Sequence, residues 1–459
     1  MYAPVSWIRE FLDADIDAKD VADRLTTAGV EVEGLRFVGL ADPRVVAGRV
    51  LTLQPHPKDQ GLLLVEVDVG GDAPIKVVSR APNLAGAEGR MVAVALDGAT
   101  IFSAKPGQTL DEVKAGMSHG AWSDGALVSP REIGLGQDHN GVAFLRDVAP
   151  GQPLGEALGA DGGEVVLDIA ILPNIARCLG VAGVAREVAA VLGADIAPLP
   201  PLTRPGKLER VSAVGLTPTL CRRFSTALLK GVQVGPSPSD VEHRLRLCGV
   251  EPINNVVDAS NYVMLELGQP THAYDADALD TLNLEVRLAH AGETLVTLTH
   301  DHQESRVLPA GSVVVSAAGA PVALAGIVGG QATAIRPSTR QVLIEAATFA
   351  PIAIRRSQAL TKQHTHASTR FTRGVDPALT TLALDRIVTL IQRTSPDATL
   401  EWIHDASLGD EDVIRVLSFT MADIDASIGA RIPIDECRGI LERLGLSCQI
   451  ASDQQTLTV

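Results

Sequence analysis

A segment dense in proline divides this sequence into two parts. Residues 197–205 read APLPPLTRP, in which four of the nine positions are proline. Proline fixes its own backbone torsion and lacks an amide hydrogen, so closely spaced prolines form a stiff linker. We therefore expect a new domain to begin after residue 205. The 459 residues are enough for about three domains.

Short strands dominate much of the first part. Strand character is present at residues 45–53, 62–69, 75–79 and 91–96, with turn sequences such as Gly70-Gly71 and Asp97-Gly98 between them. Several short strands in succession predict a small β-barrel, and an oligonucleotide-binding barrel is one option. Further along, Val184, Val188 and Val191 share one side of a helix expected over residues 181–192.

The part after the linker mixes helices and strands. We expect strands at residues 293–298, 312–316 and 342–344, and a helix that begins near Pro377 and continues to Leu390. From about residue 412 a shorter segment follows, with a helix that places Cys437, Ile440 and Leu444 on one face and ends at Gly445. The fold class indicated is α+β with several domains.

The bulk composition excludes several functional classes. With 39 basic and 55 acidic residues the net charge is −16, so any RNA contact requires a local basic patch or a partner subunit. The five cysteines form no CxxC pair, which argues against a structural zinc site and a disulfide framework. The N-terminus lacks the pattern of a signal peptide, and no apolar run approaches the roughly 20 residues that span a bilayer. We expect a soluble cytoplasmic protein.

Residues 249–275 hold an unusual density of polar side chains beside the apolar run Val263-Met264-Leu265. The polar residues are Asn254, Asn255, Asp258, Ser260, Asn261, Gln269 and His272. Their irregular spacing argues against a simple amphipathic helix or edge strand. Two interpretations remain open: a pocket wall in which a few polar groups orient a ligand, or a loop whose Asn and Asp side chains bond to the backbone at turns.

Within this stretch, the sequence INNVVDASNYVMLELGQPTHAYD resembles the signature of the editing module of bacterial phenylalanine–tRNA ligase beta subunits. The match is long and ungapped. Three further segments resemble the same module in order and approximate spacing: ALAGIVGG from Ala323, VLIEAATFAP from Val342 and HTHASTRFTRGVDP from His364. Before the linker, PHPKDQGLLLVEVDVG and HGAWSDGALVSPREIGLG resemble parts of the family's tRNA-binding barrel.

The resemblance implies a domain organisation. Residues 1–40 and 152–195 would form an N-terminal α/β domain, interrupted at residues 41–151 by a small OB-like tRNA-binding barrel. Residues 206–400 would form an α+β editing (deacylase) module, and residues 410–459 the incomplete start of a small helical/β domain. The chain would then be a truncated beta subunit that consists of its N-terminal portion.

The same resemblance implies a site that hydrolyses tyrosine wrongly attached to phenylalanine tRNA. Its catalytic residues would be His272, Glu345 and Thr365, its substrate-binding residues Ser260, Asn261, Gly329 and Ala367, and it would hold no metal ion. A synthetic site for phenylalanine cannot strongly reject an analogue that only adds a hydroxyl, so a second site removes the wrong product. Glu345 would accept a bond from the tyrosine hydroxyl, and His272 would orient or deprotonate water. We expect both in one cavity with room for an aromatic amino acid.

Partners and cofactors also follow from the resemblance. The full-length family forms an α2β2 heterotetramer that binds tRNA(Phe), and the alpha subunit holds the aminoacylation site. We expect ATP and Mg2+ in that holoenzyme, neither of them bound by this segment alone, and no membrane partner. Several residues depart from the family pattern, and in the editing module these are Ser260 in place of Thr, Glu251 in place of Arg, His366 in place of Asp and Thr372 in place of Glu. A free-standing aminoacyl-tRNA deacylase and a non-enzymatic tRNA-binding protein remain alternatives.

Overall fold

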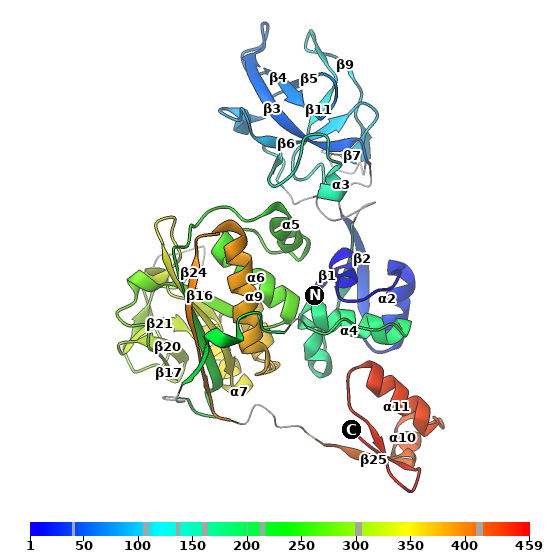
Figure 1. Cartoon of the computed structure of the whole chain (residues 1–459), viewed down its shortest axis with the longest axis vertical. Helices are drawn as coiled ribbons and strands as arrows, with labels where there is room; N and C mark the ends of the chain where they lie inside the picture. The colour runs from blue at the N-terminus through cyan, green and yellow to red at the C-terminus, as the bar shows by residue number, and fades with distance from the viewer. Residues whose placement is uncertain are drawn as a thin grey trace.

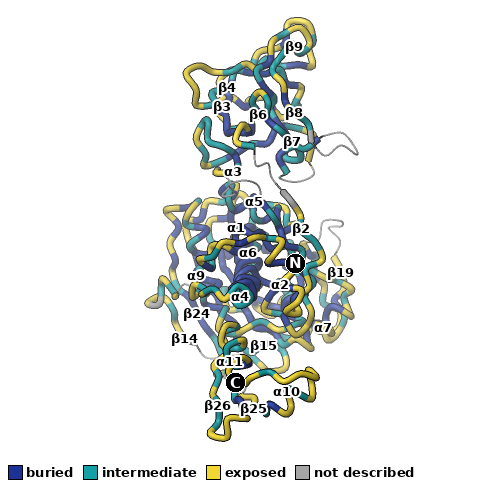
Figure 2. The backbone as a smooth tube through the Cα atoms, turned by 90° about the vertical axis from the view of Figure 1, so that its right-hand side faces the viewer, coloured by how far each residue is buried: buried dark blue, intermediate teal, exposed yellow. Residues whose placement is uncertain are grey.

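The computed structural model describes residues 1–38, 42–103, 110–134, 138–157, 164–199, 201–211, 216–298, 305–409 and 416–459. Figure 1 shows a mixed α+β architecture, in which a barrel-like sheet lies apart from a larger body of sheets and helices. Buried residues concentrate inside each of these bodies (Figure 2). Within the described ranges, no helix combines the length and the apolar character needed to cross a bilayer.

The chain begins in a three-stranded antiparallel sheet of order β1-β13-β2, built from Tyr2–Pro4, Glu164–Ile169 and Val32–Val38. The helices that accompany it are α1 (Val5–Arg9), α2 (Ala18–Thr27) and α4 (Val181–Leu192). The bounds of α4 confirm the helix that the sequence predicts. Because β13 pairs with both β1 and β2, segments more than a hundred residues apart in sequence share one sheet, with the barrel-like sheet inserted between them.

The barrel-like sheet has the order β11-β6-β3-β4-β5, with β12 beside β6. Its strands are β3 (Val45–Pro55), β4 (Leu63–Asp68), β5 (Ile75–Ser79), β6 (Met91–Leu96), β11 (Gly125–Leu127) and β12 (Phe144–Leu145), which confirms the four strands expected here. The amide of Asp124, next to β11, donates to the carbonyl of Lys76 on β5 at 2.8 Å. The two edges of the sheet therefore meet, and the barrel is nearly closed. Two short pairs accompany it, β7 (Thr100–Phe102) with β8 (Leu110–Glu112), and β9 (Gly116–Ser118) with β10 (Ala121–Ser123).

A five-stranded sheet of order β14-β24-β15-β23-β16 forms the centre of the larger body. Its strands are β14 (Leu208–Val211), β15 (Cys221–Lys230), β16 (Thr271–Asp275), β23 (Gln341–Phe349) and β24 (Thr399–Ser407). Side chains alternate between its two faces. Val342 and Ile344 belong to the core formed with helices, whereas Leu343 belongs to the core shared with a second sheet. Glu345 has the same parity as Leu343, so its side chain enters the layer between the two sheets.

The second sheet has the order β17-β20-β21-β22 and consists of Leu284–Leu288, Val313–Ala317, Ala320–Leu324 and Val328–Gly329. Two helices, α7 (Pro351–Thr361) and α8 (His366–Phe371), contribute to the core of the same layer. The short pair β18 (Thr294–Leu295) and β19 (Arg306–Val307) completes this region. The strands expected near residues 293–298, 312–316 and 342–344 correspond to β18, β20 and β23.

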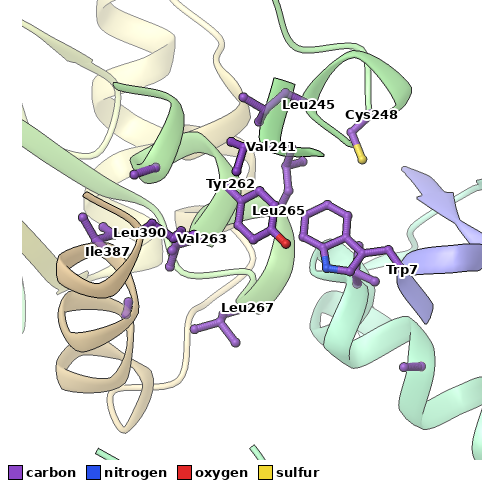
Figure 3. Packing of buried hydrophobic residues seen from close by; sticks show 14 of the residues in the cluster. Trp7, Val241, Leu245, Cys248, Tyr262, Val263, Leu265, Leu267, Ile387 and Leu390 are labelled. Atoms are coloured by element: carbon purple, nitrogen blue, oxygen red, sulfur yellow. The ribbon is translucent and has the colours of Figure 1, made fainter. Parts of the chain in front are cut away.

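Part of the polar stretch in the middle of the chain forms a helix, which neither interpretation of its sequence predicted, while Thr271 and His272 near its end line a cavity, as the pocket-wall interpretation predicted. α6 spans Asn255–Leu267, and the side chain of Asn254 caps it by accepting from two backbone amides. Figure 3 shows why the amphipathic period is absent: Tyr262 faces Trp7 on one side, while Val263 lies towards α9 (Leu379–Thr394) on the other. A helix covered on all sides needs no polar face. Its polar groups instead bond to neighbouring elements, as Asp258 does to Ser237.

The remaining elements are shorter. α5 (Ser239–Leu247) precedes α6, α3 (Leu154–Ala157) follows the barrel, and 3-10 turns occur at Pro82–Leu84, Pro173–Leu179, Pro205–Lys207, Ala276–Ala278 and Gln331–Thr333. At the C-terminal end, β25 (Ser418–Thr420), β27 (Thr456–Thr458) and β26 (Gln449–Ile450) form a sheet beside α10 (Met421–Ile428) and α11 (Ile434–Arg443). α11 is the helix expected from Cys437 and Ile440, and Gly445 follows it with a φ of 84°.

Candidate active site

His272 and Glu345 are direct neighbours in the five-stranded sheet. They lie opposite each other in the antiparallel pair β16–β23, although Glu345 follows His272 by 73 positions in the sequence. Side chains at directly opposed positions project to the same face and lie about 5 Å apart at their β-carbons. Tyr274 follows His272 by two positions on β16, so it projects to that face as well.

These side chains open into one cavity, which we call the inner cavity. Its volume is about 60 Å³. Its walls come from β16, β20, β23, α8 and the segment from Ala323 to Gly329, which runs from the end of β21 through β22. Apart from His272, Tyr274 and Glu345, most of the lining is apolar, with Val315, Phe349 and Phe371 among the larger side chains. The sequence-based expectation that His272 and Glu345 face one cavity therefore agrees with the coordinates.

The size of the inner cavity differs from the expectation. A cavity of about 150 Å³ is needed to hold benzene, whereas about 10–15 Å³ suffices for one water molecule. The inner cavity thus has room for a few waters but not for an aromatic ring. An aromatic side chain can enter only if part of the wall moves.

His272 is neutral at physiological pH. Burial lowers its pKa to about 4. Its Nε2 is buried, and no atom of the described residues forms a hydrogen bond with it. An uncharged imidazole with an unbonded nitrogen beside a small cavity can bind and orient a water molecule.

Glu345 is a buried carboxyl group, 5% exposed. Burial raises its pKa to about 7, while a hydrogen bond from Tyr274 acts in the opposite direction. The Tyr274 hydroxyl donates to Oε2 of Glu345 at 2.5 Å. This contact was not anticipated, because the sequence interpretation assigned the carboxylate to a substrate hydroxyl alone.

Gly329 forms the wall opposite the imidazole. A β-carbon at this position would overlap Cε1 and Nε2 of His272, so only glycine allows this approach. Its carbonyl accepts from the amide of Leu298 at 3.0 Å, which fixes the backbone there. The substrate-binding residue predicted at Gly329 therefore lies against the predicted catalytic histidine.

Thr365 has a different position from the one expected. It is the N-cap of α8, forms a capping box with Ser368, and donates through Oγ1 to the carbonyl of Ile327 at 2.9 Å. Ile327 lines the inner cavity, but Thr365 itself lines a neighbouring one. Ala367, two residues further along the chain, does line the inner cavity.

The neighbouring cavity, which we call the outer cavity, has a volume of about 740 Å³. It lies between the N-terminal sheet and α8. Charged and titratable side chains line it, namely Glu33, Asp168, His364, His366, Arg370 and Arg373. Arg370 is 2% exposed and bonds to the carbonyls of Leu179 and His366 rather than to a carboxylate of the described residues. α8 thus separates two cavities of opposite character.

Two predicted residues lie behind the inner cavity. The Ser260 hydroxyl on α6 is within 2.7 Å of the Thr271 hydroxyl and donates to the Thr271 carbonyl at 2.9 Å, and Thr271 lines the inner cavity. Asn261 is the next residue of α6 and lines neither cavity.

The residue that sequence reasoning missed is Tyr274. Side chains along a strand alternate between its two faces, so Tyr274, two positions after His272, was predictable on the same face.

No cluster of metal ligands accompanies the site. Among the described residues, no three His, Cys, Asp or Glu side chains come together in a way that could hold a metal ion.

Comparisons with known proteins define the class of this protein. Residues 220–396 match the B3/4 domain, and this range includes β15, β16, β23 and the residues that line the inner cavity. The chain is 40% identical to the phenylalanine–tRNA ligase beta subunit of Moorella thermoacetica over 403 residues, which cover 85% of this chain and 48% of that protein. It is 36% identical to the beta subunit of Syntrophus aciditrophicus over 452 residues, covering 97% and 54%.

The chain belongs to the phenylalanine–tRNA ligase beta subunit family. It spans about half the length of the curated relatives it matches. A crystal structure of an N-terminal fragment of the beta subunit from Pyrococcus horikoshii covers 65% of this chain and 82% of that chain at 14% identity. The TM-score of that match is 0.31.

Proposed function

We propose that the inner cavity hydrolyses the ester of tyrosine wrongly attached to phenylalanine tRNA. The observation that carries this proposal is the direct pairing of His272 with Glu345 across β16 and β23, with both side chains in one cavity. One group can activate water, and the other can recognise a phenol.

The chemistry uses the neutral imidazole. Water held by Nε2 of His272 attacks the ester carbonyl carbon, and the imidazole accepts the proton. The bond between that carbon and the terminal ribose oxygen then breaks, and the proton passes to the ribose oxygen. The products are free tyrosine and uncharged tRNA. An aminoacyl ester is already activated, so a Ser-His-Asp triad is not required.

Selectivity depends on Glu345. A buried carboxylate accepts a strong hydrogen bond from the hydroxyl of a tyrosyl group, which phenylalanine lacks. Since the inner cavity is smaller than an aromatic ring, the ring enters by displacing the segment from Ala323 to Gly329. Gly326 in that segment has a φ of 65° and packs against Phe349 and Phe371. The carbonyls of Ile327 and Gly329 accept hydrogen bonds from Thr365 and Leu298, so the displacement must break polar as well as apolar contacts.

Deacylation by the full chain tests this proposal. We expect tyrosyl-tRNA(Phe) to be hydrolysed faster than phenylalanyl-tRNA(Phe), and Glu345→Gln to reduce that preference about tenfold or more, since a hydrogen bond to a charged group is lost. Glu164→Gln is a matched control, because Glu164 on β13 is also a buried carboxyl, 3% exposed, but accepts a hydrogen bond from Ser6 of α1, away from the inner cavity. Equal effects of the two variants on the preference would contradict the proposal.

We also propose that the nearly closed sheet is an OB-like tRNA-binding barrel inserted in the N-terminal α/β domain. Trp122 and Met117 are exposed and lie opposite each other in the β9–β10 hairpin, where an aromatic face can stack on a base. Trp122→Ala is expected to weaken tRNA(Phe) binding, measured by fluorescence anisotropy of labelled tRNA. Unchanged binding would leave the barrel without this role.

For the whole protein, we propose a ligase subunit that joins an alpha subunit, which supplies ATP- and Mg2+-dependent aminoacylation. Copurification with an alpha subunit separates this proposal from a free-standing deacylase. Deacylation of tyrosyl-tRNA(Phe) separates both from a protein that only binds tRNA.

A further inference from the structure

The phenol hydroxyl of Tyr274 forms a hydrogen bond with the carboxyl group of Glu345, the same group that would recognise a substrate phenol. Its Oη donates to Oε2 of Glu345 at 2.5 Å, and the residue is 0% exposed. The Tyr274 ring meets the His272 ring edge to face, with centroids 4.4 Å apart and an interplanar angle of 83°. Tyr274 therefore contacts both members of the proposed catalytic pair, and its position is fixed by packing.

An ionised carboxylate has two oxygens that accept hydrogen bonds, and it has no proton to donate. Tyr274 uses Oε2 of Glu345, and none of the described residues donates to Oε1. The remaining titratable groups that face Glu345 are His272 on β16 and Cys221 on β15. α8 contributes only Ala367 and Phe371 to the inner cavity, and the segment from Ala323 to Gly329 contributes no charge.

We propose that Tyr274 is a positioning residue that holds Glu345 as a hydrogen-bond acceptor, so that Oε1 accepts the phenol of a tyrosyl substrate. One carboxylate then bridges two phenols, one from the protein and one from the substrate. This inference rests on the proposed function, and it adds the residue that sets the selectivity of the same site.

The directions in which the pKa values of Tyr274 and Glu345 are shifted support this role. Burial and the neighbouring carboxyl raise the pKa of Tyr274 well above its ordinary value, so its hydroxyl remains a donor at any physiological pH. The bond from Tyr274 lowers the pKa of Glu345 against the effect of burial. Without it, the carboxyl group holds its proton to higher pH, and a protonated carboxyl is a weaker acceptor for a substrate phenol.

Tyr274→Phe tests the inference because it removes a single oxygen and keeps the ring. The first measurement is infrared titration of the protonated carboxyl band from pH 5 to 9, with the band assigned by its loss in Glu345→Gln. We expect the midpoint of Tyr274→Phe to lie about one pH unit higher, a tenfold change in the ionisation constant. The second is calorimetric binding of L-tyrosinamide and L-phenylalaninamide at pH 7.5, for which we expect the affinity ratio to fall about tenfold.

Tyr262→Phe is the matched control. Tyr262 is also buried, 2% exposed, but its hydroxyl bonds to Arg244 at 2.5 Å away from the inner cavity. It should change neither the midpoint nor the affinity ratio.

An unchanged midpoint in Tyr274→Phe overturns the inference, whatever the deacylation rate. A variant that hydrolyses tyrosyl-tRNA(Phe) with undiminished preference overturns it while the proposed function stands. If the unsubstituted chain binds neither amide and hydrolyses neither ester, the proposed function fails, and the inference fails with it.

Discussion

The two cavities on either side of α8 differ in almost every physical respect. The inner cavity is small and largely apolar, and burial shifts the pKa of its histidine downward and that of its carboxyl upward. The outer cavity is about 740 Å³ and lined by charged groups. Burial lowers the pKa of Arg370 there to about 10, but the guanidinium stays charged at neutral pH and bonds to backbone carbonyls. Burial therefore favours the neutral forms of His272 and Glu345 in the inner cavity, whereas Arg370 in the outer cavity stays charged.

The largest expected effect comes from filling the inner cavity. Gly329→Ala places a methyl group where the imidazole of His272 now lies. The imidazole must shift, so we expect deacylation of tyrosyl-tRNA(Phe) to fall by about 100-fold or more, with a stability loss of about 1–3 kcal/mol from overpacking. Gly34→Ala is the control, because a β-carbon at Gly34 meets no atom within 4 Å. Near-normal activity of Gly329→Ala would show that His272 does not act from its present position.

A pH-dependent comparison distinguishes the two groups of the inner cavity. The pKa of Glu345 is raised from 4.5 to about 7 on folding, so its contribution to stability decreases as pH rises through that range. The pKa of His272 is lowered from 6.5 to about 4, so its contribution is lost as pH falls through that range. Between pH 4.5 and 6.5 the two contributions oppose each other.

Single substitutions at Glu345 and His272 should therefore change the unfolding free energy with pH in opposite directions. Relative to the unsubstituted chain, the unfolding free energy of Glu345→Gln should rise with pH, and that of His272→Gln should fall, by up to about 1.4 kcal/mol per pH unit. His272 remains partly exposed, so its slope should be the smaller one. Urea denaturation at pH 4.5, 5.5 and 6.5 measures both, and slopes of the same sign would contradict these assignments.

How much of this could be read from the sequence depends on the range of the contacts involved. The strands of the barrel and the helix at residues 181–192 follow local periodicity, and the structure has them at the expected positions. α6 was misread because burial on every side removes the polar face that periodicity detects. The domain boundaries and the roles of the site residues remain predictions.

The inner cavity could not be predicted from local sequence patterns. The pairing of His272 with Glu345 was expected only through the family resemblance, since strand register between distant segments has no local signal. The placement of Thr365 in the outer cavity depends on which side of α8 faces which sheet. Tyr274 was accessible from the alternation along β16, but its bond to Glu345 required the register of β23.

A smaller effect is expected at the helix that divides the cavities. Thr365→Ala removes the N-cap of α8 and the bond to Ile327, which should cost about 1 kcal/mol of stability. Thr365→Ser keeps the hydroxyl and should lose less than half of that. Chemical denaturation measures both variants, and deacylation measured alongside decides whether Thr365 also contacts the substrate. A loss of activity far beyond the loss of stability, absent in Thr365→Ser, would assign it that contact.

The smallest expected effect concerns His366, the first residue of α8. An acidic side chain in the first turn of a helix interacts favourably with its unpaired amides, and Arg370 lies close enough to affect the titration of His366. His366→Asp should therefore raise the unfolding free energy by about 0.5 kcal/mol at pH 7, and the gain should disappear below about pH 4, where the carboxyl group is protonated. His364→Asp is the control, because His364 is equally exposed but precedes the helix. Equal gains from the two substitutions would contradict a specific interaction with the helix end.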